Sequence, residues 1–370
     1  MTHSPFALSR HSTKGVAHRG LSLLAGLMPL MLISPAALAY EPNEGHHKLT
    51  QAAFNVLEKC NMPLSAELKQ QVMAGNLAMD KGAGKLPDTL MDSDQAKALY
   101  PMKVRIHNWH FYHPDKTSDA QRLSGKTDMS MARLWQAGVT GLTEADSSQQ
   151  GYYLGALIHL IQDVTVPAHT APVYHGPKII AWKPEFAPLV SYLGWGFRGL
   201  FSISDPIDTW PVSTQTGMRC PQLDGIASEP GVSAALSQLR DTTARQTLTA
   251  LTAPMAGCNQ RWGIFWQQDI GHKYFSGYNQ QLKHIDKMGD FTINDQRCTP
   301  DYQGFVAGRH KAAVDATVVA LGIWLKQSGA LNQSAALKEG ANKSSHSSGF
   351  DSSDSSRHST EGMPRPAEVE

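Results

Sequence analysis

Apolar residues recur at helical spacing in several stretches of the chain. In 151–163, GYYLGALIHLIQD, apolar side chains lie nearly all round the predicted helix, which is typical of a buried one. The same spacing predicts further helices over 48–57, 72–80, 232–251, 261–290 and about 308–326. The pattern therefore predicts a mostly helical protein.

Two residues with metal-binding side chains lie in the helix predicted over 151–163. His159 and Asp163 are four residues apart, so they lie on one helix face, one turn from each other. Pro167 ends the regular pattern, and His169 follows two residues later. Because zinc accepts histidine nitrogens and aspartate oxygens, the spacing H-x3-D-x5-H indicates a metal site. The alternative is a core histidine paired with an aspartate one turn on.

More candidate ligands lie earlier in the chain. His46 and His47 lie just ahead of the helix predicted over 48–57. They could be metal ligands or ordinary polar residues on the surface. Asp80 ends an apolar helical stretch and is a candidate ligand. The alternative is a helix-terminal carboxylate with no further role. The segment HNWHFYHPDKT carries three histidines among aromatic residues, namely His107, His110 and His113.

The N-terminal 39 residues are expected to be a secretory signal peptide. Arg10, Lys14 and Arg19 form a positive segment, an apolar run follows, and Ala37-Leu38-Ala39 has the pattern of a cleavage site. The mature protein is then expected to begin at Tyr40 and to be secreted or periplasmic.

Composition sets the outline of the mature part. Residues 40–331 suffice for one large domain, whereas 332–370 are Ser-rich, almost without apolar residues, and expected to be a disordered tail. A formal net charge of +1 gives no support for a stable nucleic-acid partner.

The four cysteines all lie in the mature part. In an exported protein, an even number predicts two disulfides, and three connectivities of Cys60, Cys220, Cys258 and Cys298 are open. One suggestion is a disulfide between Cys220 and Cys258, which would join the two ends of the segment between them.

The apolar and aromatic segment 182–203 is too polar and interrupted to span a membrane. One interpretation is a buried hairpin over the metal face. The other is a lipid-facing flap that inserts Trp195, Phe197 and Leu200 into a membrane interface.

Together, these clusters resemble the secreted bacterial zinc-dependent phospholipases C, which include the phosphatidylcholine-preferring enzyme and clostridial alpha-toxin. More distantly they resemble the zinc-dependent single-strand nucleases. The family presents an N-terminal aromatic residue, then His, Asp and His, then H-x3-D-x5-H, and the same order occurs in Tyr40, His46, Asp80, His110, His159, Asp163 and His169. The last predicted helix is similar to the family's closing helix.

The resemblance implies an all-α fold, one multi-helix domain with an insertion over about 176–300, and two to three zinc ions. It makes those seven residues metal ligands, with Asp163 shared between two ions. Tyr40 would bind through its free amine and carbonyl, so signal removal is expected to activate the protein. Asp80 is the expected general base that orients or deprotonates the attacking water.

The chain departs from the family pattern at the third zinc. No H-x3-E pair follows His169, and the candidates to replace it are His175, Glu185 and His272.

The resemblance implies a phospholipase C that cleaves phosphatidylcholine-type glycerophospholipids to diacylglycerol and a phosphorylated head group. It would act as a monomer at a membrane surface. The alternatives are a single-strand nuclease and a membrane-binding protein with a decayed site.

Overall fold

The structure is a computed structural model of the whole chain. It describes residues 45–81, 110–115, 122–123, 127–128, 130–173, 205, 207, 210–212, 220, 231–266, 290–293 and 295–329. Most of these residues are helical, as the sequence predicts. The α-helices in this part of the chain are α1 (His47–Lys59), α2 (Ala66–Lys81), α6 (Ala132–Glu144), α7 (Ser147–Asp163), α11 (Val232–Thr252) and α12 (Tyr302–Gln327).

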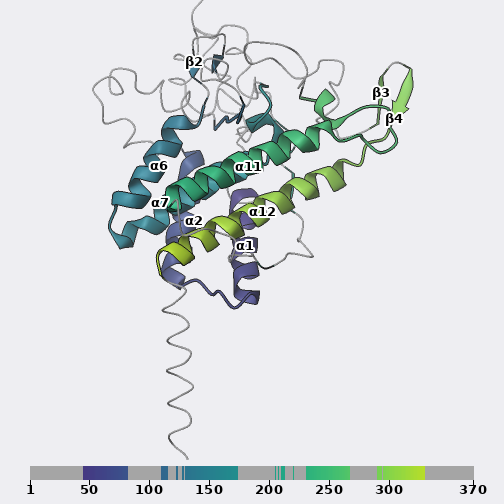
Figure 1. Cartoon of the computed structure of the whole chain (residues 1–370). Coiled ribbons are helices and arrows are strands. Elements are labelled where there is room, and N and C mark those ends of the chain that lie inside the picture. The colour runs from purple at the N-terminus through teal and green to yellow at the C-terminus, as the bar shows by residue number, and fades with distance from the viewer. Residues whose placement is uncertain are drawn as a thin grey trace, which may run out of the picture.

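The helices surround α7. Helices α2 and α6 pack against α7, while α12 contacts α1, α7 and α11. Figure 1 shows α11 and α12 side by side and running in opposite directions, with α1 across the far side of α12. From Leu154 to Ile161 every apolar residue of α7 is buried, as the sequence pattern indicates, whereas Tyr152 and Tyr153 are partly buried.

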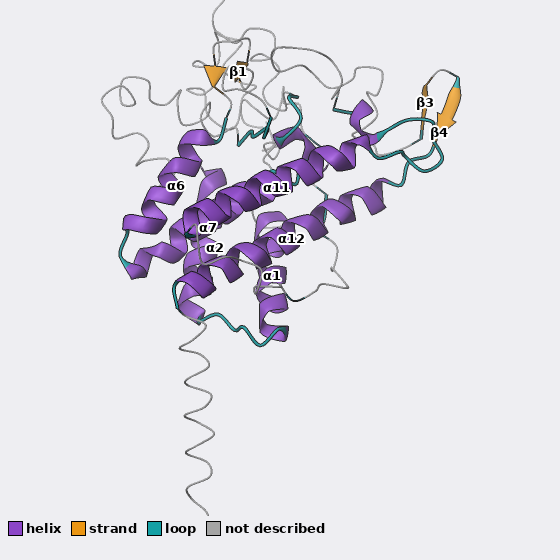
Figure 2. Ribbon diagram, viewed as in Figure 1, coloured by secondary structure: helices purple, strands orange, loops and turns teal. Residues whose placement is uncertain are grey.

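Strands are short and peripheral. The hairpin of β1 (Arg122–Leu123) and β2 (Thr127–Asp128) is antiparallel, as is that of β3 (Phe291–Ile293) and β4 (Gln296–Cys298). Figure 2 places the second hairpin beyond the adjoining ends of α11 and α12. The fold of the described residues is therefore largely all-α.

The helix predicted over 261–290 is wrong at its start. Trp262–Ile264 form a single 3-10 turn, and Phe265 and Trp266 follow it into an aromatic cluster with Tyr302. The spacing predicted the burial of Trp262 and Phe265 correctly, but it did not predict the backbone conformation. Residues 267–289 lie outside the described part.

Glycines allow α2 and α6 to pack closely against α7. A Cβ added at Gly155 of α7 would lie 2.0 Å from the carbonyl oxygen of Val72 in α2, and one at Gly75 of α2 would lie 1.8 Å from that of Tyr152. The α2 and α7 backbones therefore touch, with no room for a side chain between them. Helix α6, which the sequence analysis did not predict, contacts α7 through Gly138 and Gly141.

One disulfide links Cys60, at the end of α1, to Cys220. The suggested bond between Cys220 and Cys258 is thus wrong, because sequence spacing does not report which cysteines meet in space. Cys258 and Cys298 are thiols in this structure.

Among the described residues, no helix combines the length and the apolar character that crossing a membrane requires.

Candidate metal centre

The last turn of α7 carries the centre of the site. His159 and Asp163 are completely buried, and the i, i+4 spacing puts His159 Nε2 3.3 Å from Asp163 Oδ2. The helix ends here because Pro167 begins a 3-10 turn, Pro167–His169. Threonine hydroxyls donate hydrogen bonds to carbonyl groups at this helix end. Thr165 donates to the carbonyl of Gln162, and Thr247 of α11 donates to the carbonyl of Val164.

His46 approaches from the start of α1. It has helical backbone angles and zero exposure, and its Nε2 lies 3.3 Å from Asp163 Oδ1. Its ring stacks on that of His159, with centroids 3.8 Å apart. His47, by contrast, is only partly buried. Of the two adjacent histidines, His46 is therefore the one that lies beside Asp163.

His110 reaches the site from a short extended segment. Its Nδ1 lies 2.6 Å from Asp163 Oδ2 and 3.2 Å from His159 Nε2. The segment is held on both sides, because the amide of Tyr112 donates to the carbonyl of His169 and that of Met131 donates to the carbonyl of Phe111. His110 has a φ of +54°, a left-handed conformation that is uncommon for histidine and frequent at functional sites.

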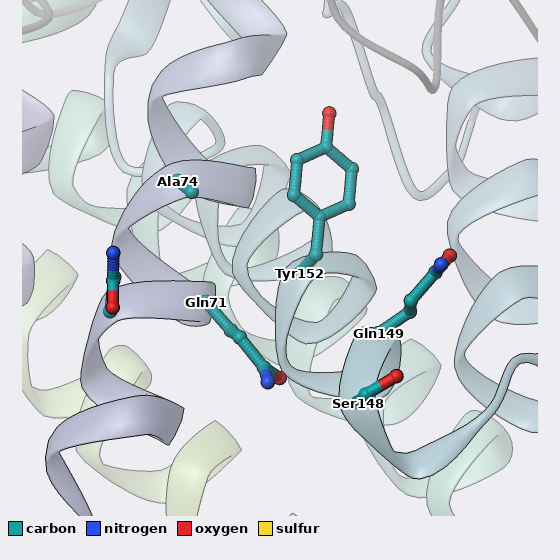
Figure 3. A pocket seen from close by; sticks show the side chains of 6 residues that line it. Gln71, Ala74, Ser148, Gln149 and Tyr152 are labelled. Carbon is teal, nitrogen blue, oxygen red and sulfur yellow. The ribbon is translucent and has the colours of Figure 1, made fainter.

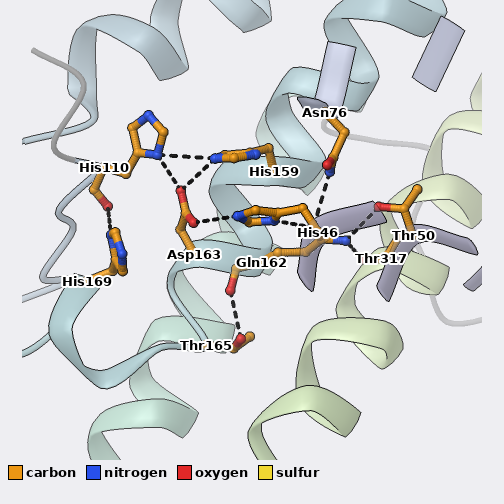
Figure 4. Close-up of polar contacts among 10 residues, drawn as sticks. All are labelled: His46, Thr50, Asn76, His110, His159, Gln162, Asp163, Thr165, His169 and Thr317. Carbon is orange, nitrogen blue, oxygen red and sulfur yellow. Dashed lines mark hydrogen bonds and ion pairs between the residues drawn. The ribbon is translucent and has the colours of Figure 1, made fainter. Parts of the chain in front are cut away.

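The Asp163 carboxylate faces a different set of histidines with each oxygen. Oδ1 points to His46, whereas Oδ2 points to both His110 and His159 (Figure 4). The ligand atoms of His46, His159 and Asp163 all lie within 4.8 Å of one another. This buried group could hold a metal ion.

The distances suit a small metal ion. With bonds of about 2.0 to 2.1 Å, a tetrahedral site spaces neighbouring ligand atoms about 3.3 Å apart. The separations of 3.3 Å from Asp163 to His46 and to His159 match that value. The 2.6 Å contact between His110 and Asp163 is a hydrogen-bond length, so these two groups would separate if both bound one ion.

The electrostatics favour the charge states that metal binding requires. Burial opposes ionisation of Asp163, but the imidazoles of His159, His110 and His169 hold the pKa of its carboxyl well below its usual value. Burial lowers the pKa of His159 to about 3, despite the opposing effect of Asp163. The site therefore presents an anionic carboxylate beside a neutral imidazole, which are ligand forms.

His169 lies at the margin of this group. Its Nδ1 is 3.2 Å from the carbonyl oxygen of His110, and its ring centroid is 6.4 Å from that of His110. Since a carbonyl only accepts, Nδ1 carries the proton and Nε2 is left as the ligand atom. His169 does not belong to the three-residue group around Asp163 and His159.

Several predicted ligands lie outside the described part of the chain. These are Tyr40, His175, Glu185 and His272, as well as the segment 182–203 and the tail. Asp80 falls in the last turn of α2, and its side chain is likewise not described. Their roles stay predictions.

A layer of polar residues lies behind the histidines and was not predicted from the sequence. Gln162 precedes Asp163, and its side chain contacts His46, Asn76, Thr50 and Thr317 from three other helices. All five side chains are buried, and Figure 4 shows the contacts among them. A glutamine inside an otherwise apolar helix was the one signal available.

A separate pocket of about 250 Å³ lies between α2 and α7. Its lining is formed by Gln70, Gln71, Ala74, Ser148, Gln149 and Tyr152 (Figure 3). It contains none of the histidines or carboxylates of the metal centre, and no ionisable group other than the Tyr152 phenol.

Comparisons of the chain with protein-family models, with curated proteins and with solved structures give no match. The functional assignment therefore depends on the residues and geometry of the site.

Proposed function

We propose that the protein is an exported zinc-dependent phosphodiester hydrolase, and specifically a phospholipase C acting on phosphatidylcholine-type lipids. The observation that carries this proposal is the division of Asp163 between two sets of histidines. Oδ1 faces His46, and Oδ2 faces His110 and His159. A carboxylate shared in this way suits two neighbouring metal ions.

The order of the ligands along the chain supports the same assignment. In the zinc-dependent phospholipases C, the aspartate that corresponds to Asp163 is shared between two ions. The histidines that correspond to His110 and His159 bind one ion, and the histidine that corresponds to His46 binds the other. The side chains found together at Asp163 divide in the same way. His169, next to His110, would serve a third ion, and Asp80 and Tyr40 would complete the first two.

Each described residue has a physical task in this proposal. When bound, zinc ions stabilise the charge of a phosphoryl transition state and lower the pKa of bound water. Asp163 supplies negative charge inside a buried site, and His159 supplies a neutral nitrogen donor. Asp80 would orient or deprotonate the attacking water.

The disulfide between Cys60 and Cys220 also fits export, because such bonds persist in oxidising compartments.

The test uses purified protein beginning at Tyr40, assayed with mixed phosphatidylcholine micelles and, in parallel, with single-stranded DNA. Products are identified before chelation, after chelation and after zinc is restored. Diacylglycerol that disappears with the chelator and returns with zinc is the expected result. Asp163→Asn should abolish it, while Asp205→Asn, at a buried carboxylate bonded to Trp266, should not.

The other outcomes overturn the proposal in distinct ways. Zinc-dependent release of nucleotides without lipid cleavage would assign the protein to nuclease chemistry. Stoichiometric zinc with no turnover of either substrate would indicate a binding protein with a decayed site.

A further inference from the structure

We propose that Gln162 is a positioning residue that fixes the proton of His46 on Nδ1 and so directs His46 Nε2 toward Asp163 and the metal. This inference rests on the proposed metal function. It concerns a residue that the family resemblance does not include, since the phospholipase motif typically has glycine before the shared aspartate.

The orientation of the Gln162 amide follows from its partners. Thr317 donates its only hydroxyl proton to the carbonyl of Ala313, at 2.7 Å. The Thr317 oxygen, 3.0 Å from Gln162 Nε2, must therefore accept a hydrogen bond from Gln162. Thr50 Oγ1 takes the second Nε2 proton, also at 3.0 Å. The amide nitrogen thus faces the two threonines, and Oε1 faces the other way.

The proton position on His46 follows in turn. Gln162 Oε1 lies 2.7 Å from His46 Nδ1 and accepts a second bond from Asn76 at 3.2 Å. An amide oxygen only accepts, so Nδ1 must carry a proton. In neutral His46 the lone pair is then on Nε2, which lies 3.3 Å from Asp163 Oδ1.

This arrangement has a consequence for metal binding. A lone pair and a carboxylate oxygen at 3.3 Å repel unless a cation lies between them. Gln162 therefore holds His46 in the form that favours an ion at that point. Outer partners of this kind orient metal-binding histidines, and their loss typically weakens metal affinity about 10- to 100-fold.

The experiment compares Gln162→Leu and Gln162→Glu with the wild type. Leucine removes the acceptor, and zinc affinity should fall about 10- to 100-fold. Glutamate keeps an acceptor for the Nδ1 proton but has no proton to donate to Thr50 and Thr317, so Gln162→Glu should retain more of the zinc affinity than Gln162→Leu. Thr243→Val, which removes a buried hydroxyl bonded to the carbonyl of Leu239 on α11, is the control and should leave zinc affinity unchanged.

Nitrogen NMR of the imidazoles in metal-free protein gives a readout independent of zinc. His46 should carry its proton on Nδ1 in the wild type and in Gln162→Glu, and should lose that preference in Gln162→Leu. Equal loss of zinc affinity in both variants, or an Nε2-protonated neutral His46 in the wild type, would overturn the role of Gln162. A wild type that shows the Nδ1 form but binds no zinc would overturn the metal function instead.

Discussion

Helices α7 and α12 each bury a histidine, and the two histidines have different surroundings. His159 of α7 lies beside Asp163 and contacts the rings of His46 and His110. His310 of α12 is equally buried, and burial lowers its pKa to about 4. It does not belong to the group of described residues that could hold a metal ion.

This comparison shows what distinguishes a candidate ligand from a packed histidine. Burial and a low pKa occur on both helices, so neither identifies a metal site. What separates His159 is a carboxylate one turn away on which other imidazoles converge. Experiments that treat α7 and α12 as a matched pair should therefore give effects of different kinds.

The largest effect is expected from Asp163→Asn. The amide removes the charge and the two equivalent acceptor oxygens shared by the histidines, and zinc affinity should fall by more than about 1,000-fold, beyond the loss typical of an outer partner. Titration of metal-free protein with zinc measures it. His310→Gln, on α12, serves as the matched control and should bind zinc as the wild type does. Equal losses in both would erase the distinction between the two helices.

The stability of the protein at acid pH should depend on His310. Its pKa is about 4 in the folded protein, against an ordinary value of about 6.5 in the unfolded chain. Between these values the unfolded state binds the extra proton, so the free energy of unfolding falls as pH decreases from about 6.5 to 4. The contribution of His310 to this loss is about 3 kcal/mol.

Denaturant unfolding of wild type and His310→Gln at pH 7 and pH 4 isolates that contribution. The variant cannot titrate at this position, so it should lose about 3 kcal/mol less than the wild type over the same range. Equal losses of unfolding free energy in the two proteins would show that folding does not lower the pKa of His310.

The sequence alone identified the part of the site that depends on local spacing. His159 and Asp163 lie on one helix face by the i, i+4 rule, and the structure confirms their contact. The convergence of His46 and His110 on them came from a family resemblance. Gln162 was missed because its partners, Thr50, Asn76 and Thr317, come from three other helices.

Other misses have similar physical causes. Helix α6 contains Gly138 and Gly141, which lower helix propensity but allow close contact with Leu157 and Tyr153 of α7. Cysteine pairing depends on which chain segments meet, which spacing does not report. In each case tertiary packing decided what the local pattern left open.

Glycine substitutions extend the comparison of the two helices to packing. Gly155→Ala places a methyl group 2.0 Å from the carbonyl oxygen of Val72, so α7 and α2 must move apart. Overpacking of this kind lowers the free energy of unfolding by about 1 to 3 kcal/mol. Thermal or denaturant unfolding measures it. An unchanged stability would mean that the two backbones are not in contact.

The smallest effect, and one of opposite sign, is expected on α12. A Cβ at Gly308 meets nothing within 4 Å, so Gly308→Ala adds no clash. Alanine is favoured over glycine in a helix interior by about 0.8 to 1.0 kcal/mol, partly because it restricts the unfolded chain. Gly308→Ala should therefore raise the free energy of unfolding by up to about 1 kcal/mol, as measured by the same unfolding experiment. A loss as large as that of Gly155→Ala would mean that another part of the chain covers α12 at this position, as α2 covers α7.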